Sequence, residues 1–493
     1  MSLLILVCLS ANLFAQITIP AFPTAEGYGM FATGGRGGEV VVVTNLEDDA
    51  KGETKGSLRW ALNQHLDKPT TIVFRVSGII NLVTDLRSKR TAGTTIAGQT
   101  APGDGICIRG GKVNFGGCEN LVIRHLRFRI GLDDEGKFIK GGSIGIENAN
   151  NFIIDHCTFG WSSEENMTMY DNKKSTVQWS IIHEGLYSSG HGKGARSYGA
   201  QWGGETATYH HNLLAHNISR TPRFNGTKHN DVNVQYEYVN NVNYNWGKAT
   251  SAYGAYVEID GTYQCNMINN YYKPGPAYPD NLTSYFAQSS YAKSMGNTRI
   301  AKWYMKGNYM EGKANSALNS DNYKGLDASG YTENGVSKSL LVMPEPFKTS
   351  HTLKIESATN AYKSVLIGAG AFPRDTVDRR IVNEVRTGTA SGKGTNPQYR
   401  HNDEKQLNNP YYAVAKGIID NPILAFGNQA YPEYKTYNTI VDNDQDGMDD
   451  AWEIANGLNP QDASDRNKKT VSGYTCLEVY LNSLVGEKIN LEF

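Results

Sequence analysis

The residues best suited to chemistry are basic side chains in two nearby stretches of the sequence. They are Lys193 and Arg196 in GHGKGARSYG, and Arg220, Arg223 and Lys228 in and just after SRTPRFNG. Guanidinium groups bind carboxylates through paired hydrogen bonds, and Pro222 fixes the backbone between the two arginines. In a coiled sheet the two stretches would lie above one another and line one groove suited to an acidic polysaccharide. The alternative is an ordinary solvated turn.

An acidic pair, Glu164 and Glu165, comes shortly before the basic stretches. Neighbouring side chains on a strand point to opposite faces, so one of the two is expected to face the groove. A carboxylate oxygen there suits Ca²⁺. Acid–base cleavage of a glycosidic bond needs two carboxylates on one face, and the sequence shows no such pair. The alternative is a solvated Glu-Glu turn.

A second metal motif lies near the C-terminus, in DNDQDGMDDAWE. Asp442, Asp444, Asp446, Gly447 and Glu453 match every fixed position of the twelve-residue calcium loop D-x-[DN]-x-[DN]-G-x₅-E. Four carboxylates would surround one Ca²⁺, and the glycine would make the sharp turn. We expect a structural site rather than a catalytic one, with an acidic linker as the alternative.

Short apolar runs separated by Gly, Asn or Asp turns fill the chain from about residue 70. Such runs read as strands, and the long helical patterns of βαβ units are missing. Asn212, Asn241, Asn270 and Asn308 each separate two apolar runs and are spaced 29, 29 and 38 residues apart. An asparagine at a tight turn tolerates left-handed geometry and can bond its counterpart in the next turn. The pattern predicts an all-β parallel β-helix, with an Asn-rich β-sandwich as the alternative.

Two later regions differ from this pattern. Within residues 313–432, the segment 378–386 has helical spacing of Ile381, Val382 and Val385. We predict three parts: a signal peptide over 1–15, a β-helix domain over 16–432, and a small helical module over 433–493. The last would be EF-hand-like or thrombospondin type 3-like and would bind calcium.

Composition limits the possible partners. The 493 residues contain 48 Lys and Arg against 49 Asp and Glu, a net charge of −1, which gives no overall attraction to nucleic acid or an anionic membrane. The apolar start MSLLILVCLSANLFA is too short to span a bilayer and fits a secretory signal. No later segment is expected to span a membrane. We expect a secreted or periplasmic monomer, with attachment to the outer surface as a further option.

Together the motifs resemble a known family. AEGYGMFATGGRGGEVVVVTNLEDD, GSLRWAL, TIVFRVSGII, TIAGQTAPG, FIIDHCTF, YHHNLLAHN and SRTPRF resemble, in order, the pectate lyases of polysaccharide lyase family one. The version with the appended DNDQDG module is similar to members from Bacteroidetes. The resemblance covers roughly residues 20–430. It implies a right-handed parallel β-helix that cleaves polygalacturonate by Ca²⁺-assisted β-elimination.

The resemblance also assigns roles to individual residues. Arg220, in the R-x-P element, matches the family's catalytic base, and Lys193 matches the lysine that holds a substrate carboxylate. The family's second arginine usually lies five residues after the first, where this chain has Asn225. Arg223 is the nearest substitute, and with Arg196 and Lys228 it is expected to bind substrate.

The groove calcium site departs from the family pattern. The Asp-x-Asp pair that normally precedes the DH motif is replaced by Lys140, Gly141 and Gly142. Glu164 or Glu165 keeps a later acidic position. We expect either that substrate carboxylates complete the shell of a bound Ca²⁺ or that Lys140 partly replaces the metal.

Arginine is an unusual base because its pKa lies above about 12. A desolvated, strongly cationic groove would lower that pKa and give an alkaline optimum. Two other functions remain open at this point: a hydrolase of the polygalacturonase type, and a non-catalytic pectin-binding protein. Absorbance of unsaturated product from polygalacturonate, with and without chelator, separates the three.

Overall fold

The computed structural model describes most of the chain. The described residues are 18–133, 137–225, 233–248, 250–255, 262–278, 285–291, 300–312, 315–394 and 415–493. The predicted signal peptide and Lys228 lie outside these residues. Within them, no helix is long and apolar enough to cross a membrane.

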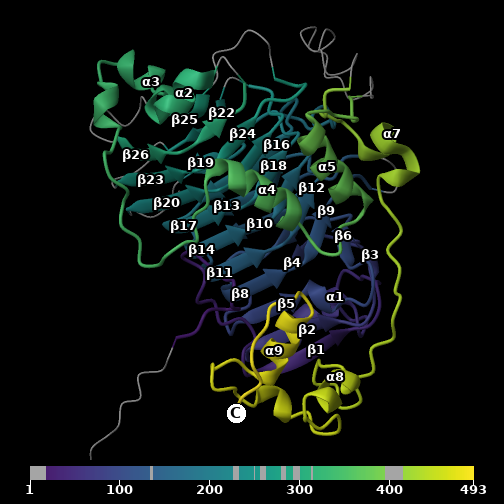
Figure 1. Cartoon of the computed structure of the whole chain (residues 1–493). Helices are drawn as coiled ribbons and strands as arrows, with labels where there is room; N and C mark the ends of the chain where they lie inside the picture. Colours follow the sequence, from purple (N-terminus) through teal and green to yellow (C-terminus); the bar gives the residue numbers. More distant parts are fainter. Residues whose placement is uncertain are drawn as a thin grey trace, which may run out of the picture.

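The described strands form three sheets that run the length of a coil (Figure 1). The first sheet contains β1 (Glu39–Val43), β2 (Thr70–Phe74), β5 (Thr94–Ala97), β8 (Glu119–Arg124), β11 (Asn150–Asp155), β14 (Lys173–Gln178), β17 (Thr206–His210), β20 (Val234–Val239), β23 (Tyr263–Ile268) and β26 (Ala301–Lys306). The second contains β4 (Leu86–Arg87), β7 (Val113–Asn114), β10 (Ile144–Glu147), β13 (Glu165–Tyr170), β16 (Tyr198–Gly203), β19 (Arg223–Asn225), β22 (Thr250–Gly254), β25 (Tyr285–Ser289) and β28 (Leu326–Asp327). The third contains β3 (Gly78–Asn81), β6 (Ile106–Arg109), β9 (Leu126–Arg129), β12 (Thr158–Gly160), β15 (Ile181–His183), β18 (Leu213–Ala215), β21 (Val242–Tyr244), β24 (Tyr271–Lys273) and β27 (Tyr309–Met310).

Consecutive strands visit the three sheets in turn, and their pairings are parallel. The predicted right-handed parallel β-helix is therefore confirmed. Alternate side chains of each strand point into the coil and stack on those of the next turn. The stacked rings of Phe128 and Phe159 lie 5.1 Å apart, and those of Tyr236 and Tyr263 lie 5.3 Å apart.

The asparagine ladder is confirmed at the corner between the first and third sheets. The Nδ2 of Asn212 donates to Oδ1 of Asn241 at 3.0 Å, Asn241 to Asn270 at 3.1 Å, and Asn270 to Asn308 at 2.8 Å. The left-handed conformation, however, belongs to the residue before each of them, such as His211 with φ 54°. That residue turns the corner, so the following asparagine can point inward along the stack.

Helices cover parts of the coil's surface. The α-helices are α1 (Leu58–Leu62), α2 (Ser316–Ser320), α3 (Ser329–Thr332), α4 (Ala358–Gly368), α5 (Thr376–Thr387), α7 (Pro422–Phe426), α8 (Asp450–Ala455) and α9 (Cys476–Ser483). The short 3₁₀-helices are η1 (Gly98–Thr100), η4 (Asn322–Gly325), η5 (Lys338–Leu340), η7 (Gly427–Gln429) and η8 (Asp465–Asn467). The predicted helical segment 378–386 lies within α5 and buries its three apolar residues, as expected.

Two of the three sheets have covered outer faces. Helices α4 and α5 pack on the third sheet through a cluster that includes Leu213 and Val242 (Figure 1). The N-terminal segment, with Phe22, packs on Val122 and Ile153 of the first sheet. No hydrophobic cluster among the described residues lies on the outer face of the second sheet. Within the described residues, the outer face of the second sheet is therefore left free of packed apolar segments.

Candidate functional site

The outer face of the second sheet presents a row of polar residues, one from each turn. Register pairs Thr168 with Gln201, Gln201 with Arg223, Arg223 with Tyr253 and Tyr253 with Gln288. The residues next to them in sequence, such as Met167 and Phe224, are buried in the core. Strand alternation thus fixes the row on the outside.

Arg220 lies at the centre of this face, just before β19. Its guanidinium forms an ion pair with Glu165, donates to Oε1 of Gln201 at 2.7 Å and stacks 4.2 Å from the ring centre of Tyr198. Its backbone is left-handed, with φ 59°. That conformation costs a residue with a side chain about 1–2 kcal/mol. The surrounding contacts must hold Arg220 in place against this strain.

Burial lowers the pKa of Arg220 below its usual value. The phenolic oxygen of Tyr253 opposes this lowering of the pKa, and the positive charge of Arg223 adds to it. The ion pair with Glu165 also favours the protonated guanidinium. The site therefore provides the desolvation that an arginine base requires. It also contains a carboxylate, that of Glu165, which opposes deprotonation of the guanidinium.

The other basic residues lie around Arg220. Arg223 shares Gln201, with 3.5 Å between its Nη1 and Oε1. Arg196 donates to the hydroxyl of Tyr198 at 3.4 Å, and its guanidinium lies 5.3 Å from that ring. Lys193 is exposed in the turn before β16. The structure thus brings three of the five predicted basic residues into one contact network, with Lys193 in the loop beside them.

Both predicted carboxylates contact basic side chains of the site. Glu165 binds Arg220, and Oε1 of Glu164 lies 3.0 Å from Nε2 of His191. His191 also accepts a hydrogen bond from the backbone N–H of Lys193 at 3.1 Å. The expectation that only one of the pair faces the groove stays a prediction. Glu164 precedes the first residue of β13, so strand alternation does not apply to it.

The groove donors fit calcium only in part. Ca²⁺ takes six to eight oxygen ligands, whereas Glu164 and Glu165 supply two carboxylates that already contact His191 and Arg220. Among the described residues, the clusters able to hold a metal lie elsewhere. Lys140 is exposed, and Gly141 accepts a hydrogen bond from the backbone of Glu164 at 3.3 Å.

Sequence reasoning missed the uncharged members of the site. Tyr198, Gln201 and Tyr253 contact or approach the arginines, and none belongs to a charged motif. The alternation in YGAQWG could have shown Gln201 as outward, because Ala200 and Trp202 are apolar on either side of it.

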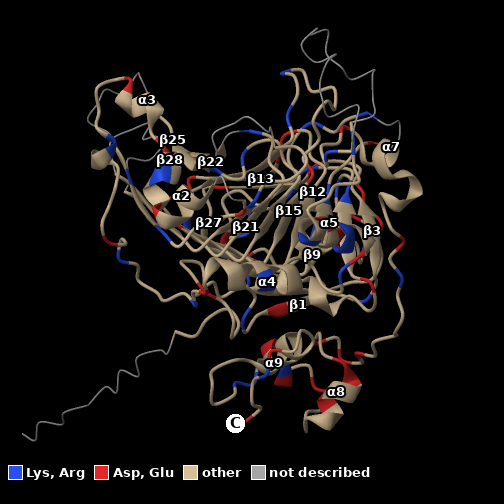
Figure 2. Ribbon diagram, turned by 45° about the horizontal axis from the view of Figure 1, so that its top comes forward, with Lys and Arg blue, Asp and Glu red and all other residues tan. Residues whose placement is uncertain are grey.

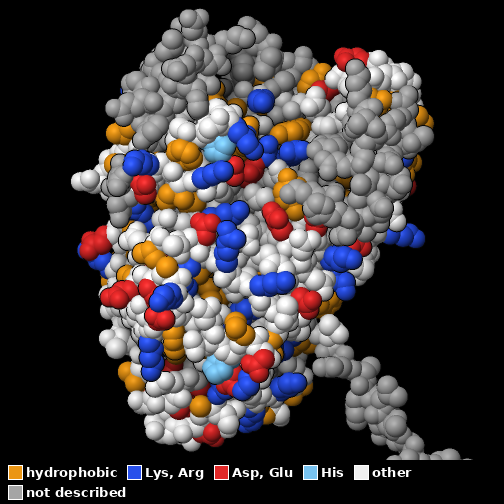
Figure 3. Space-filling view, turned by 180° about the vertical axis from the view of Figure 1, so that it is seen from behind, with side chains coloured by type: hydrophobic (Ala, Val, Ile, Leu, Met, Phe, Trp, Pro, Cys, Tyr) orange, Lys and Arg blue, Asp and Glu red, His pale blue; other side chains and the backbone are white. Residues whose placement is uncertain are grey.

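Basic side chains gather along the middle of the face seen from behind, with acidic ones among them (Figure 3).

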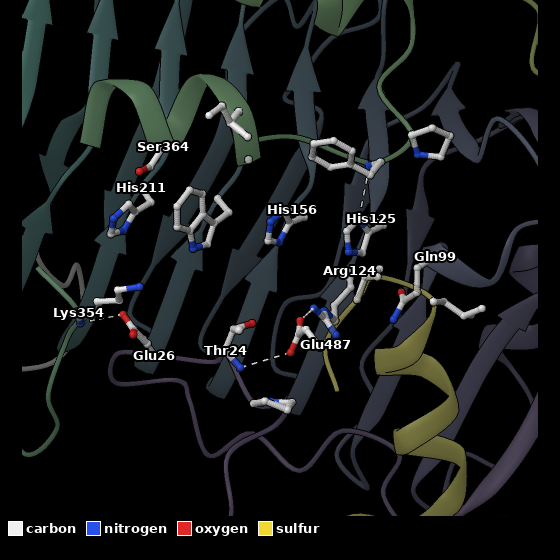
Figure 4. Close-up of a pocket in the computed structure, with 18 of the residues that line it drawn as sticks. Thr24, Glu26, Gln99, Arg124, His125, His156, His211, Lys354, Ser364 and Glu487 are labelled. Atoms are coloured by element: carbon white, nitrogen blue, oxygen red, sulfur yellow. Dashed lines mark hydrogen bonds and ion pairs between the residues drawn. The ribbon is translucent and has the colours of Figure 1, made fainter. Parts of the chain in front are cut away.

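A cavity of about 1020 Å³ lies away from this site. A row of stacked rings from His125, His156, Trp179 and His211 forms its wall (Figure 4). The faces of these rings pack against one another, and the nearby Arg124 forms an ion pair with Glu487 at 2.6 Å. The cavity holds none of the predicted groove residues.

The C-terminal loop brings its predicted ligands together. Asp442, Asp444 and Asp446 offer carboxylate oxygens within 4.8 Å of one another. Burial, followed by repulsion from neighbouring carboxylates, raises the pKa of Asp446 to about 7 and that of Glu453 to about 8. Uncompensated negative charge at such a cluster is the situation that a bound cation relieves.

The chain is similar in sequence to known proteins over nearly its whole length. No family model matches the chain. A protein of Aspergillus flavus named "Probable pectate lyase C" is 31% identical over 482 residues, covering 97% of each chain. A protein of the same name from Emericella nidulans is 30% identical over 470 residues, covering 95% of this chain and 93% of its own. Among solved structures, the major allergen of cedar pollen is 16% identical, with a TM-score of 0.47 over 70% of this chain and 92% of its own. A pectate lyase from Bacillus sp. N165, solved with trigalacturonate, is 17% identical, with a TM-score of 0.42 over 70% of this chain and 98% of its own.

Proposed function

The chain belongs to the pectate lyase family, and we propose that it cleaves polygalacturonate, the pectin backbone, by β-elimination to unsaturated oligogalacturonides. One observation carries this proposal. Arg220 is held on the uncovered face of the coil, partly desolvated, with Arg223 and Arg196 beside it. A base surrounded by carboxylate-binding groups is what elimination from a uronate requires.

The reaction begins at the weakly acidic C5 proton of a galacturonate residue. Arg223, Arg196 and Lys193 bind the uronate carboxylates and stabilise the charge that develops when this proton leaves. Arg220 removes the proton, the C4–O bond breaks, and a C4–C5 double bond forms. The leaving oxygen takes up a proton and becomes the new end of the shortened chain.

Protonation of Arg220 sets the expected pH dependence. Only the neutral guanidine can accept the C5 proton, and burial increases its population while Glu165 decreases it. Because the neutral fraction grows with pH, we expect turnover to rise into the alkaline range.

We propose that calcium assists the groove through Glu164, Glu165 and the carboxylates of the substrate itself. A bound ion would supply Lewis-acid neutralisation of the uronate carboxylate. Lys140 could neutralise the same charge without a metal, beside Arg223, Arg196 and Lys193.

The finer features of the protein are also proposals. The apolar first fifteen residues support export to the cell exterior or periplasm, or attachment to the outer surface. The appended acidic loop supports a Bacteroidetes-type member of the family. We also propose that the protein is a monomer.

The test is incubation with polygalacturonate while ultraviolet absorbance is recorded, with added Ca²⁺ and with chelator. We expect the absorbance of a conjugated double bond to appear. New reducing ends without that absorbance would favour the hydrolase. Binding without cleavage would favour the non-catalytic alternative.

A further inference from the structure

The acidic C-terminal segment contains a carboxylate that the loop motif does not include. Asp465 lies at the start of η8, twelve residues beyond the end of the motif, yet its oxygen lies within 4.8 Å of those of Asp446 and Glu453. Asp446 also belongs to the cluster with Asp442 and Asp444. Five carboxylates from two separate stretches therefore gather around one region, where Figure 2 shows acidic residues beside α8.

Several of these oxygens are buried without a partner. Asp446 and Glu453 are both 0% exposed. Both carboxylate oxygens of Glu453, Oδ2 of Asp444, Oδ2 of Asp446 and Oδ1 of Asp465 have no hydrogen-bond partner. The other oxygen of Asp465 accepts from the backbone of Asn459 at 2.9 Å, which fixes the side chain. Buried anionic oxygens without donors need a cation.

The backbone around these oxygens is already arranged as a loop. The N–H groups of Asp446 and Gly447 donate to Asp442 at 3.0 and 3.1 Å. Gly447 adopts φ 94°, and a Cβ there would lie 3.1 Å from Val40 of β1. Only glycine fits both this turn and the close approach to β1.

The same loop is fastened to the first turns of the coil. Nη2 of Arg75, which follows β2, lies 2.6 Å from Oδ2 of Asp442. Met448 is fully buried in a cluster with Val73 of β2, Ala97 of β5 and residues of α9. One side of the loop therefore carries the acidic cluster, and the other side packs on the outer face of the first sheet.

We propose that Asp465 completes one Ca²⁺ site with Asp442, Asp444, Asp446 and Glu453, and that the ion fastens the C-terminal segment onto β1, β2 and β5. Oxygen-only donors in this number suit Ca²⁺, and the two unpartnered oxygens of Glu453 suit bidentate coordination. Mg²⁺ is a poorer fit because it prefers to keep several waters. The ion thereby stabilises the whole coil and not only its own loop. This inference does not rest on the proposed lyase activity.

The experiment compares the full-length protein with Asp465→Asn, and with Asp462→Asn as the matched control. Asp462 is an exposed carboxylate in the same segment that bonds only Ser464 and local backbone. Calorimetric Ca²⁺ titration should show a site that Asp465→Asn weakens at least tenfold and Asp462→Asn leaves unchanged. Ca²⁺ at a hundredfold excess over Kd should raise the Tm of the coil by about 2–4 °C. Arg75→Gln should retain Ca²⁺ binding and reduce that rise.

Two results would overturn the inference. Unchanged Ca²⁺ affinity in Asp465→Asn would remove Asp465 from the site. A Ca²⁺ effect limited to hydrogen exchange in residues 440–466, with β1, β2 and the coil's Tm unaffected, would show that the ion orders its own loop only.

Discussion

Replacing Arg220 by alanine should abolish turnover at a measurable cost in stability. The ion pair with Glu165 is mostly buried, with 15% and 13% of the two side chains exposed. Removing the arginine leaves the carboxylate of Glu165 without its cation, and leaves Oε1 of Gln201 with only the longer contact from Arg223 at 3.5 Å. An unsatisfied buried group costs about 1–3 kcal/mol, which for a chain of this size lowers the Tm by about 1–3 °C. Loss of a general base should lower kcat by about 10²–10⁴.

The assay is initial velocity on polygalacturonate by ultraviolet absorbance, beside a thermal melt of each variant. Arg87→Ala is the matched control, because Arg87 lies on the same sheet but is 78% exposed. It should change neither measurement. The double variant Arg220→Ala with Glu165→Gln should recover most of the stability and none of the turnover, because the uncharged amide no longer needs a cation. Near-normal turnover in Arg220→Ala would refute the assignment of Arg220 as the base.

Three further perturbations test other parts of the structure. Lys193→Ala should raise KM and lower kcat in the absorbance assay while leaving the Tm unchanged, because this side chain is exposed; unchanged kinetics would exclude it from substrate binding. Burial lowers the pKa of His125 well below its usual value and that of His211 to about 4. The unfolded chain therefore binds more protons below about pH 6.5, and in saturating Ca²⁺ the Tm should fall as pH drops from 6.5 toward 4; a flat profile would contradict this. Asn241→Ala should destabilise by about 1–3 kcal/mol in denaturant unfolding, because Asn212 loses its acceptor, whereas the exposed Asn490→Ala should have no effect.

The coil could be predicted because its signals are local. Each apolar run is one strand, and each ladder asparagine marks one turn, so a repeat of about 29 residues is visible without knowing any contact. The covering of the first and third sheets was not predictable in the same way. Val122 meets Phe22, and Leu213 meets α4 and α5, through contacts between segments far apart in sequence.

The residues of the candidate site show the same difference between local signals and contacts that form only on folding. Arg220 and Arg223 stand out because a charged R-x-P-R element between strands is unusual, and the structure places both on the open face. Gln201 and Tyr198 are uncharged and common in strands, so only the register beside Arg223 reveals them. The calcium motif does not include Asp465, because this residue lies outside the twelve motif positions and approaches the other carboxylates only through tertiary folding.

The packing of the last residues on the first strands has a consequence for the order of synthesis. Val73 and Ala97 emerge early, but Met448, Leu477 and Tyr480, which cover them, emerge near the end. Until then β1 is an uncovered edge strand, and its sheet presents an apolar outer surface. The nascent chain must therefore keep this surface from self-association until Tyr480, 407 residues beyond Val73 and 383 beyond Ala97, has followed.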